Sequence, residues 1–581
     1  MYASSQTQAV RTRTIRNRSA NSATAIHAGR LESPDRLVTE WMPFEERSME
    51  TEYRTPRRGV LVALLFLMPL VAYLPALDGD FVWDDDYNVT ENPHLRDLDG
   101  LQRIWLDTHS TQQYYPLTHT SFWIDYQLWG LHPLGYHLGN VLLHAGSAVL
   151  LWLVLLELGV PGAWLAAAVF ALHPVHVESV AWITERKNTL SAFFYLSAAL
   201  AYLRFALRED TPNRRDTPLA LAACMLFACA LLAKTVTSTL PVALALLVWW
   251  KRGRLGRRHL AWLGSMLVAG AAMGLVTLSL ETHSVGAEGS EFSLSVGERI
   301  IVAGRALWFY VGKLLWPTDL AFSYSRWHVD AGLSRQYLYA GAAAAAAVVS
   351  WMARRRLGAG PFVAATYFVI TVGPALGFVN VFYSRYAFVA DHFQYLASIG
   401  PIALLAAAAS RLKLPPIAAR VLFGLVLLTL GALTWQQARS YEDQETLWRH
   451  SITADPHSFM AHYNLAELLD RQGAVEEALH HYREALRINP EWSDALVNIG
   501  SILGRQGKPD EALEYFDRAI AIAPDQVLTH FDRGLALEMK GRTDLALAAY
   551  REAIRLQPDL VQAHRNLAVL QLSEKLADPP R

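Results

Sequence analysis

The stretch YHLGNVLLHAGSAVLLWLVLLE at residues 136–157 decides the fold class, because its 22 residues include one charged side chain, the final glutamate. A bilayer core of about 30 Å requires about 20 helical residues to cross it. Lipid offers no hydrogen-bond partner to backbone amides, so each amide must be paired within the helix. The stretch therefore predicts a membrane span. Ten further apolar stretches follow the same rule: 59–76, 161–181, 188–207, 217–234, 236–250, 259–280, 337–352, 361–381, 393–410 and 416–436. Together they predict an all-α, multi-pass membrane bundle of about eleven spans.

The distribution of lysine and arginine predicts which connections face the cytoplasm. Basic clusters occupy every second connection, as the positive-inside rule requires, and they lie at 57–58, 208–215, 251–258, 354–356 and 411–420. The alternation holds only if the apolar segment 299–316, which contains Arg305 and Lys313, is an amphipathic helix at the outer interface. A cytoplasmic N-terminus and an external C-terminus follow.

Composition narrows the remaining possibilities. Residues 1–57 are rich in arginine and contain no apolar run, which predicts a disordered cytoplasmic tail, and the first span lies too far along the chain for a cleavable signal peptide and should act as a signal anchor. The net charge of −1 gives no electrostatic argument for nucleic acid, and we predict no such partner. Cys224 and Cys229 lie in one apolar run, which favours packing over a disulfide or a metal site.

A period of 34 residues governs the sequence after residue 440. Pro490, Pro524 and Pro558 recur at this spacing, and glycine, alanine and aromatic residues keep the same period. The pattern resembles tetratricopeptide repeats, in which small alanines let paired helices approach, an aromatic ring fills the gap and proline closes the unit. We predict repeats at about 459–490, 493–524 and 527–558, with a capping helix from 561, in a soluble α-solenoid domain of residues 439–577.

Four polar residues also keep this period, and they are Asn464, Asn498, Asp532 and Asn566. A ladder of side-chain amides can bind a peptide backbone without reading its sequence. The arrangement resembles the asparagine ladder of the nucleocytoplasmic O-linked N-acetylglucosamine transferase. The alternative is that asparagine serves a local purpose within each repeat, and the sequence leaves both interpretations open.

The segment GDFVWDDD at 79–86 begins the first external loop, residues 77–135. It places Asp80, Asp84, Asp85 and Asp86 within seven residues, just beyond a membrane helix. Carboxylates are costly there unless they are hydrated, paired or functional. A solvated acidic turn and a calcium loop with hard oxygen ligands are the alternatives to a catalytic site.

Four segments taken together resemble the multi-pass glycosyltransferases of the GT-C superfamily, and most of all the transmembrane and tetratricopeptide-repeat O-mannosyltransferases and their bacterial relatives. The segments are GDFVWDDDYNVTENPHLRD, HPVHVESVAWITERKN, AKTVTSTLPVALALLVWW and ADHFQYLASIG, and the resemblance extends from about residue 60 to 577. It implies a polyisoprenyl-phosphate-linked sugar as donor, an acidic pair in the first external loop and inversion at the anomeric carbon. Carried over to this sequence, the acidic pair is Asp84 and Asp85. We expect Asp84 to be the base toward an acceptor hydroxyl and Asp85 to assist it.

A leaving phosphate at the membrane surface requires cations on the same side. Lys234 is the first candidate, and the others are Arg186, Lys187, Arg326 and Arg385. Each of these side chains has an alternative role, since lysine and arginine at the ends of spans often extend to the interface. His392 stands where many relatives carry arginine, so a phosphate contact there becomes pH-dependent or absent.

His173, His176 and Glu178 in HPVHVES are spaced like metal ligands, but a zinc site would require a further ligand. Some members of the superfamily use a divalent cation, but the resemblance to protein O-mannosyltransferases implies a metal-free site without a cofactor. We expect the triad to hydrogen-bond the sugar or to pack beneath Asp84. Tyr114 and Tyr115 are candidates for the acceptor path or for an interfacial aromatic belt.

The leading hypothesis is a membrane glycosyltransferase domain at 58–438 that transfers mannose or another hexose from a polyisoprenyl phosphate to serine or threonine. The acceptor polypeptide would lie in the repeat groove, and membrane lipid would surround the spans. The alternative is a non-catalytic, membrane-anchored scaffold for envelope assembly. A transporter is disfavoured because the ionisable residues cluster at one face. The alanine- and arginine-rich composition indicates a bacterial inner membrane with periplasmic repeats, or an endoplasmic reticulum membrane with luminal repeats in a eukaryote.

Overall fold

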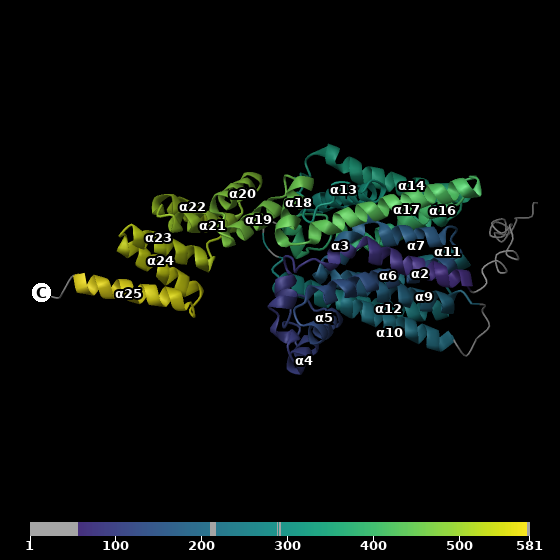
Figure 1. Cartoon of the computed structure of the whole chain (residues 1–581), viewed down its shortest axis with the longest axis horizontal. Coiled ribbons are helices and arrows are strands. Elements are labelled where there is room, and N and C mark those ends of the chain that lie inside the picture. Colours follow the sequence, from purple (N-terminus) through teal and green to yellow (C-terminus); the bar gives the residue numbers. More distant parts are fainter. Residues whose placement is uncertain (1–55, 209–215, 288, 290–291, 578–581) are drawn as a thin grey trace, which may run out of the picture. The chain divides into compact units, whose positions relative to one another are not determined.

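The computed structural model describes residues 56–208, 216–287, 289 and 292–577, and Figure 1 shows them as a succession of helices. No strand occurs in these ranges, and the predicted all-α class is confirmed. The chain divides into two compact units, Met1–Arg58 and Gly59–Arg581, and every contact described below lies within the second. The predicted tail before residue 56, and Arg214 and Arg215 of the second basic cluster, lie outside the described residues.

Five helical segments in the described ranges are long and apolar enough to cross a membrane. They are α6 (Pro133–Glu157), Ile183–Ala206 with α9 (Arg186–Ala206), α10 (Asp216–Ala233), α12 (Arg257–His283), and Pro416–Tyr441 with α17 (Pro416–Ala438). The remaining predicted spans coincide with bent or shorter helices and with α14 (Leu338–Leu357), which ends in three arginines. The shorter helices are α2 (Pro56–Ala72), α11 (Leu240–Arg252), α15 (Gly360–Val372) and α16 (Ile399–Ala409). Length and composition alone therefore support five or six spans in the described chain, fewer than the eleven predicted.

Breaks in the helices account for part of this difference. The predicted span 161–181 is split into α7 (Ala163–Leu172), a 3-10 turn (Pro174–His176) and α8 (Val177–Ala181), with a bend of 56°. Proline cannot donate a backbone hydrogen bond, and its ring clashes with the preceding turn. A second 3-10 segment, η7 (Thr235–Thr239), precedes α11. Irregular backbone within a membrane bundle is tolerated only where protein or water satisfies its polar groups. We therefore expect the unpaired backbone groups at both breaks to face the inside of the protein.

The segment predicted to lie at the interface forms α13 (Val296–Leu315), whose first turn is fixed by a capping box between Ser295 and Glu298. One face of α13 is buried and includes Ile301 and Tyr310, whereas Trp308 is exposed. Helix α13 is not among the described helices that are long and apolar enough to cross a membrane.

The external loop 77–135 has a fold of its own. It follows α3 (Leu74–Leu77) and contains a π-helix (Asp86–Thr90), a 3-10 turn (Pro93–Leu95), α4 (Leu98–Leu106) and α5 (Pro116–Trp129). A separate small core of Val89, Leu95, Ile104, Phe122, Tyr136 and Ile183 joins it to α6 and to the start of α9. The loop is therefore a rigid platform for the acidic motif at its start.

Paired helices make up the C-terminal region. After α18 (Gln444–Ala454) come α19 (Phe459–Arg471) with α20 (Val475–Ile488), α21 (Ser493–Arg505) with α22 (Pro509–Ile522), α23 (Val527–Met539) with α24 (Thr543–Leu556), and then α25 (Val561–Ala577). The periodic Ala478, Ala512 and Ala546 are fully buried between them. The periodic glycines Gly473, Gly507 and Gly541 have φ of 83°, 76° and 68°, a left-handed conformation that ends the first helix of each pair at low steric cost.

Candidate active site

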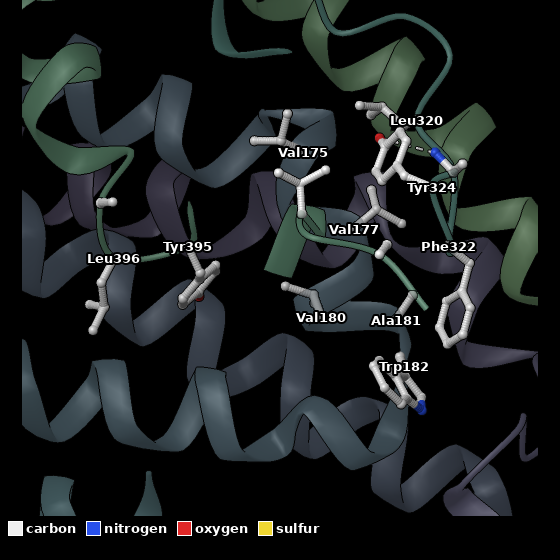
Figure 2. Packing of buried hydrophobic residues seen from close by; sticks show 14 of the residues in the cluster. Val175, Val177, Val180, Ala181, Trp182, Leu320, Phe322, Tyr324, Tyr395 and Leu396 are labelled. Carbon is white, nitrogen blue, oxygen red and sulfur yellow. Dashed lines mark hydrogen bonds between the residues drawn. The ribbon is translucent and has the colours of Figure 1, made fainter. Parts of the chain in front are cut away.

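The acidic motif is held by an unusual backbone conformation at Trp83. This residue has φ of 51°, in the left-handed region that a bulky side chain rarely adopts. Its ring packs against Trp182, Phe322 and Trp448, with centroid separations of 5.4, 5.4 and 6.4 Å. Figure 2 shows Trp182 and Phe322 from this group, whose rings lie 4.9 Å apart. Such conformations persist only where the surroundings fix them, and these three rings surround the Trp83 side chain, next to Asp84 in the chain.

Asp85 is fully buried and is bound on both oxygens. The backbone N–H of Thr184 donates to Oδ1 over 2.8 Å, the Thr184 hydroxyl donates to the same oxygen, and the N–H of Val82 donates to Oδ2 over 2.9 Å. Burial, together with the neighbouring Asp84 carboxylate, raises the pKa of Asp85 to about 8. Asp85 therefore ties the external loop to the start of α9, and its lone pairs are engaged within the protein.

Asp84 has the opposite character. The residue as a whole is partly exposed, but its Oδ1 is buried and has no hydrogen-bond partner among the described residues. Burial raises the pKa of Asp84 to about 6, and the nearby Lys187 ammonium offsets part of that rise. A carboxylate with an unused oxygen and a pKa close to neutrality has the properties required of a general base.

Two lysines converge on one carboxylate beside Asp84. Lys187 lies 3.0 Å from Glu185 Oε1, and Lys234 lies 3.2 Å from Glu185 Oε2. Lys234 also donates to Asn188 Oδ1 over 2.8 Å. Glu185 is fully buried, while both lysine side chains are 14% exposed. Two ammonium groups are thus held side by side with Glu185 between them and the Asp84 carboxylate near Lys187, an arrangement that can stabilise charge developing on an anionic ligand.

The other predicted phosphate ligands have partners elsewhere. Arg186 is 3% exposed, pairs with Asp125 at 2.9 Å and donates to the Tyr136 carbonyl over 2.7 Å. Successive residues at the start of a helix point in different directions, so Arg186 fastens the external loop while Lys187 faces the acidic motif. Arg186 thus contacts the external loop in this structure, and a contact between Arg186 and the donor stays a prediction. Arg385 stacks on the rings of Tyr386 and Trp492, the second of which begins the helix pair α21–α22.

The histidine and glutamate triad lies inside the protein. His173 Nε2 is 3.0 Å from the Leu314 carbonyl, and His176, fully buried, contacts the Phe170 carbonyl at 2.8 Å and Ser398 Oγ at 2.9 Å. Glu178 accepts from both the N–H and the Nδ1 of His392, each over 2.8 Å. These residues bind the bend between α7 and α8 to neighbouring helices. His173 and His176 thus contact neighbouring protein groups and His392 contacts Glu178, while a role of the triad at the sugar stays a prediction.

The tyrosine pair points in two directions. The Tyr114 hydroxyl donates to the Trp105 carbonyl in α4 over 2.9 Å, on the exposed side of the loop. Tyr115 is 7% exposed and lies near Thr235 and Glu185. Tyr115 alone therefore approaches the lysine pair. Two residues of the site were not predicted: Thr184, which binds Asp85, and Asn188, which binds Lys234. Both belong to the segment HPVHVESVAWITERKN, but their partners lie far away in the sequence, so no local pattern indicates these contacts.

The periodic polar residues of the repeats have local partners. Asn498 Nδ2 donates to the Tyr482 hydroxyl over 3.0 Å, and Asn566 Nδ2 lies 3.4 Å from the Tyr550 hydroxyl. Asn464 Nδ2 donates to the Met460 carbonyl over 2.8 Å, and Asp532 accepts from Ser501 over 2.6 Å. The local alternative left open by the sequence thus accounts for the amide nitrogens of the asparagines.

Known proteins similar to this chain agree with the two regions described above. Models of the tetratricopeptide repeat match residues 459–491, and 497–561 with 531–578. The protein O-mannosyl-transferase F38B6.6 of Caenorhabditis elegans is 23% identical over 480 residues, which cover 74% of this chain and 63% of that protein. The human protein O-mannosyl-transferase TMTC1 is 26% identical over 509 residues, covering 75% of this chain and 57% of that protein. Human TMTC4, also a protein O-mannosyl-transferase, is 35% identical over 166 residues, covering 24% and 22%.

Two solved structures align with about a quarter of the chain. The MamA protein of Desulfovibrio magneticus RS-1 is 17% identical, with 27% of this chain and 85% of that chain covered and a TM-score of 0.22. YrrB, described as a tetratricopeptide-repeat protein with an unusual peptide-binding site, is 21% identical, with 27% and 77% covered and a TM-score of 0.21.

The fold and the comparisons define an all-α protein with several apolar, membrane-type helices and a C-terminal series of tetratricopeptide repeats. Its curated homologues are TMTC-type protein O-mannosyl-transferases, so the resemblance predicted from the four segments is confirmed. The chain spans no more than about 63% of the length of these three relatives.

Proposed function

We propose that this protein is a membrane glycosyltransferase that moves mannose, or another hexose, from a polyisoprenyl-phosphate carrier to a serine or threonine hydroxyl of a polypeptide. The observation that carries the proposal is the contrast between the two motif aspartates. Asp85 accepts three hydrogen bonds from the protein, whereas Asp84 Oδ1 accepts none from the described residues and the Lys187 ammonium group lies nearby. The similarity to protein O-mannosyl-transferases supports the choice of sugar and acceptor.

In this scheme the Asp84 carboxylate accepts the proton of the acceptor hydroxyl as the hydroxyl oxygen attacks the anomeric carbon. The bond between the anomeric carbon and the phosphate oxygen breaks on the opposite face, and its electron pair leaves with the lipid phosphate. Lys187 and Lys234 stabilise the charge that develops on this phosphate, while Glu185 keeps the two ammonium groups together. The product sugar has the inverted configuration.

The scheme also requires a membrane orientation and a route for the acceptor. We place the membrane domain at 58–438 and the repeat domain at 439–577, with the acidic motif and the repeats on the same, external side. That side is the periplasm in a bacterium or the lumen of the endoplasmic reticulum in a eukaryote. The groove of the repeats would hold the acceptor polypeptide, as grooves of helical repeats commonly do.

The test is transfer of a labelled hexose from polyprenyl phosphate to an acceptor peptide by the purified full chain. Asp84→Asn should lower the rate about 100-fold or more, since general bases contribute about 10² to 10⁴. Asp86→Asn is the matched control, because the Asp86 carboxylate contacts Thr90 at 3.1 Å within the π-helix. Transfer that survives Asp84→Asn unchanged removes Asp84 as the base. No transfer by the wild type with several hexose donors favours the scaffold alternative.

A further inference from the structure

The first helix after the last apolar helix, α18, lies against the acidic motif. Trp448 in this helix is 1% exposed, and its ring contacts Trp83 at 6.4 Å and Phe322 at 5.3 Å between centroids. In sequence α18 precedes the first matched repeat, which begins at residue 459. In space it forms one wall of the aromatic group around the motif.

Backbone contacts reinforce this position. The N–H of Asp80 donates to the Glu442 carbonyl over 2.9 Å. A Cβ atom added at Gly79 would lie 2.8 Å from the Tyr441 carbonyl oxygen, so the two chain segments touch through their backbones. The acidic motif is thus placed directly on the residues that lead into α18.

The side of α18 that carries Trp448 also binds a third segment, residues 320–325. The Phe322 N–H donates to Ser451 Oγ over 3.3 Å, and the Ser325 N–H donates to Asp455 Oδ2 over 2.7 Å. Phe322 is the residue of this segment that reaches Trp83. Helix α18 therefore supplies one of the three rings around Trp83 and anchors a second.

We propose that Trp448 is a positioning residue of the active site, which holds Trp83 in its left-handed conformation and so directs Asp84 toward the acceptor. This inference rests on the proposed function and adds a role for the repeat-side helix that the acidic motif by itself does not suggest. A left-handed tryptophan relaxes when the packing that enforces it is removed. Asp84 follows Trp83 directly, so a relaxed Trp83 displaces the base.

The kinetic test compares Trp448→Ala, Trp448→Phe and the wild type in the full chain. A displacement of about 1 Å at a reacting group can cost about 100-fold, so we expect kcat of Trp448→Ala to fall between about 10-fold and 100-fold. The KM values for lipid donor and peptide should change little, because Lys187, Lys234 and the repeats are untouched. Trp448→Phe retains an aromatic ring and should recover most of kcat.

The control is Trp152→Ala, which removes a side chain of the same type that is 5% exposed in α6. Equal loss of kcat in Trp152→Ala and Trp448→Ala would show a general folding effect and overturn the proposal. Unchanged kcat in Trp448→Ala, or no recovery in Trp448→Phe, overturns it as well.

Hydrogen exchange separates this inference from the proposed function, because it requires no activity. Trp448→Ala should accelerate exchange of the amides at 80–88, whereas Trp152→Ala should not. This result supports the positioning role even if the wild type transfers no sugar with the donors tried. Unchanged exchange at 80–88 in Trp448→Ala refutes the role whatever the kinetics. If Trp448→Ala does not fold, the same comparison is made with Trp448→Phe, for which a smaller acceleration is expected and an unchanged rate counts against the role.

Discussion

Replacing Asp85 with alanine separates the two motif aspartates, because the structure gives them different tasks. In the wild type, the Thr184 and Val82 amides both donate to the Asp85 carboxyl group inside the protein. Alanine leaves both donors without an acceptor, and each unpaired buried amide costs about 1–3 kcal/mol. The local free energy of opening should therefore fall by about 2–6 kcal/mol. The Thr184 hydroxyl can rotate toward another acceptor and is left out of this sum.

Amide hydrogen exchange at residues 82 and 184 measures this loss directly. Since about 1.4 kcal/mol corresponds to a factor of ten, exchange at these two amides should become at least about 25-fold faster in Asp85→Ala. Asp84→Ala is the matched comparison, because its Oδ1 binds no other described residue, and exchange at both amides should stay near the wild-type rate. Equal acceleration in the two variants, or none in Asp85→Ala, would contradict the anchoring role of Asp85.

Two further predictions concern acidity and packing. Because burial raises the pKa of Asp84 to about 6 and the base must be ionised, the rate of transfer should fall about tenfold per pH unit below pH 6. Lys187→Gln removes the cation that lowers this pKa, so in that variant the decline should begin at a higher pH. A pH profile of kcat with the same midpoint in both proteins would refute the assignment of Asp84 as the base. In the repeats, a Cβ at Gly500 would lie 2.7 Å from the Phe516 ring, so Gly500→Ala should lower the free energy of unfolding by about 1–3 kcal/mol. Gly504→Ala, with open space around its Cβ, should be neutral or slightly stabilising. Thermal unfolding of both variants in the full chain gives the comparison, and equal melting temperatures would contradict the packing of Gly500 against Phe516.

Much of the fold could be predicted from local sequence pattern. Apolar length predicts α6 and α12, and the 34-residue period predicts the helix pairs and the left-handed glycines between them. Both signals depend on residues close together in the chain. The bend at Pro174 was not predicted, because the surrounding stretch is apolar enough for a continuous helix and proline is tolerated at some positions in membrane helices.

The candidate site was predicted in part. The cluster of carboxylates just beyond a membrane helix identifies the motif that contains Asp84. The residues that surround the motif in the structure, such as Thr184, Lys187 and Trp448, come from distant segments of the chain. Glu185 brings Lys187 and Lys234 together across 47 residues of sequence, and no local pattern shows that one carboxylate serves both. Arg186 and Lys187 are neighbours of the same charge type, yet the first is enclosed with Asp125 and the second faces the motif. Burial separates their roles, and burial depends on the tertiary structure.

The packing of α18 also decides where this chain can be recombined with its relatives. A chimera joined at residue 438, where the apolar helix ends, would bring a foreign α18 and would replace Trp448 together with the contacts at Ser451. A junction after Asp455 keeps that helix and its contact with Ser325 in the native membrane half. The exchangeable module is therefore shorter than the change in hydropathy indicates, and an array of repeats transplanted at the later point leaves the contacts between α18 and the external loop intact.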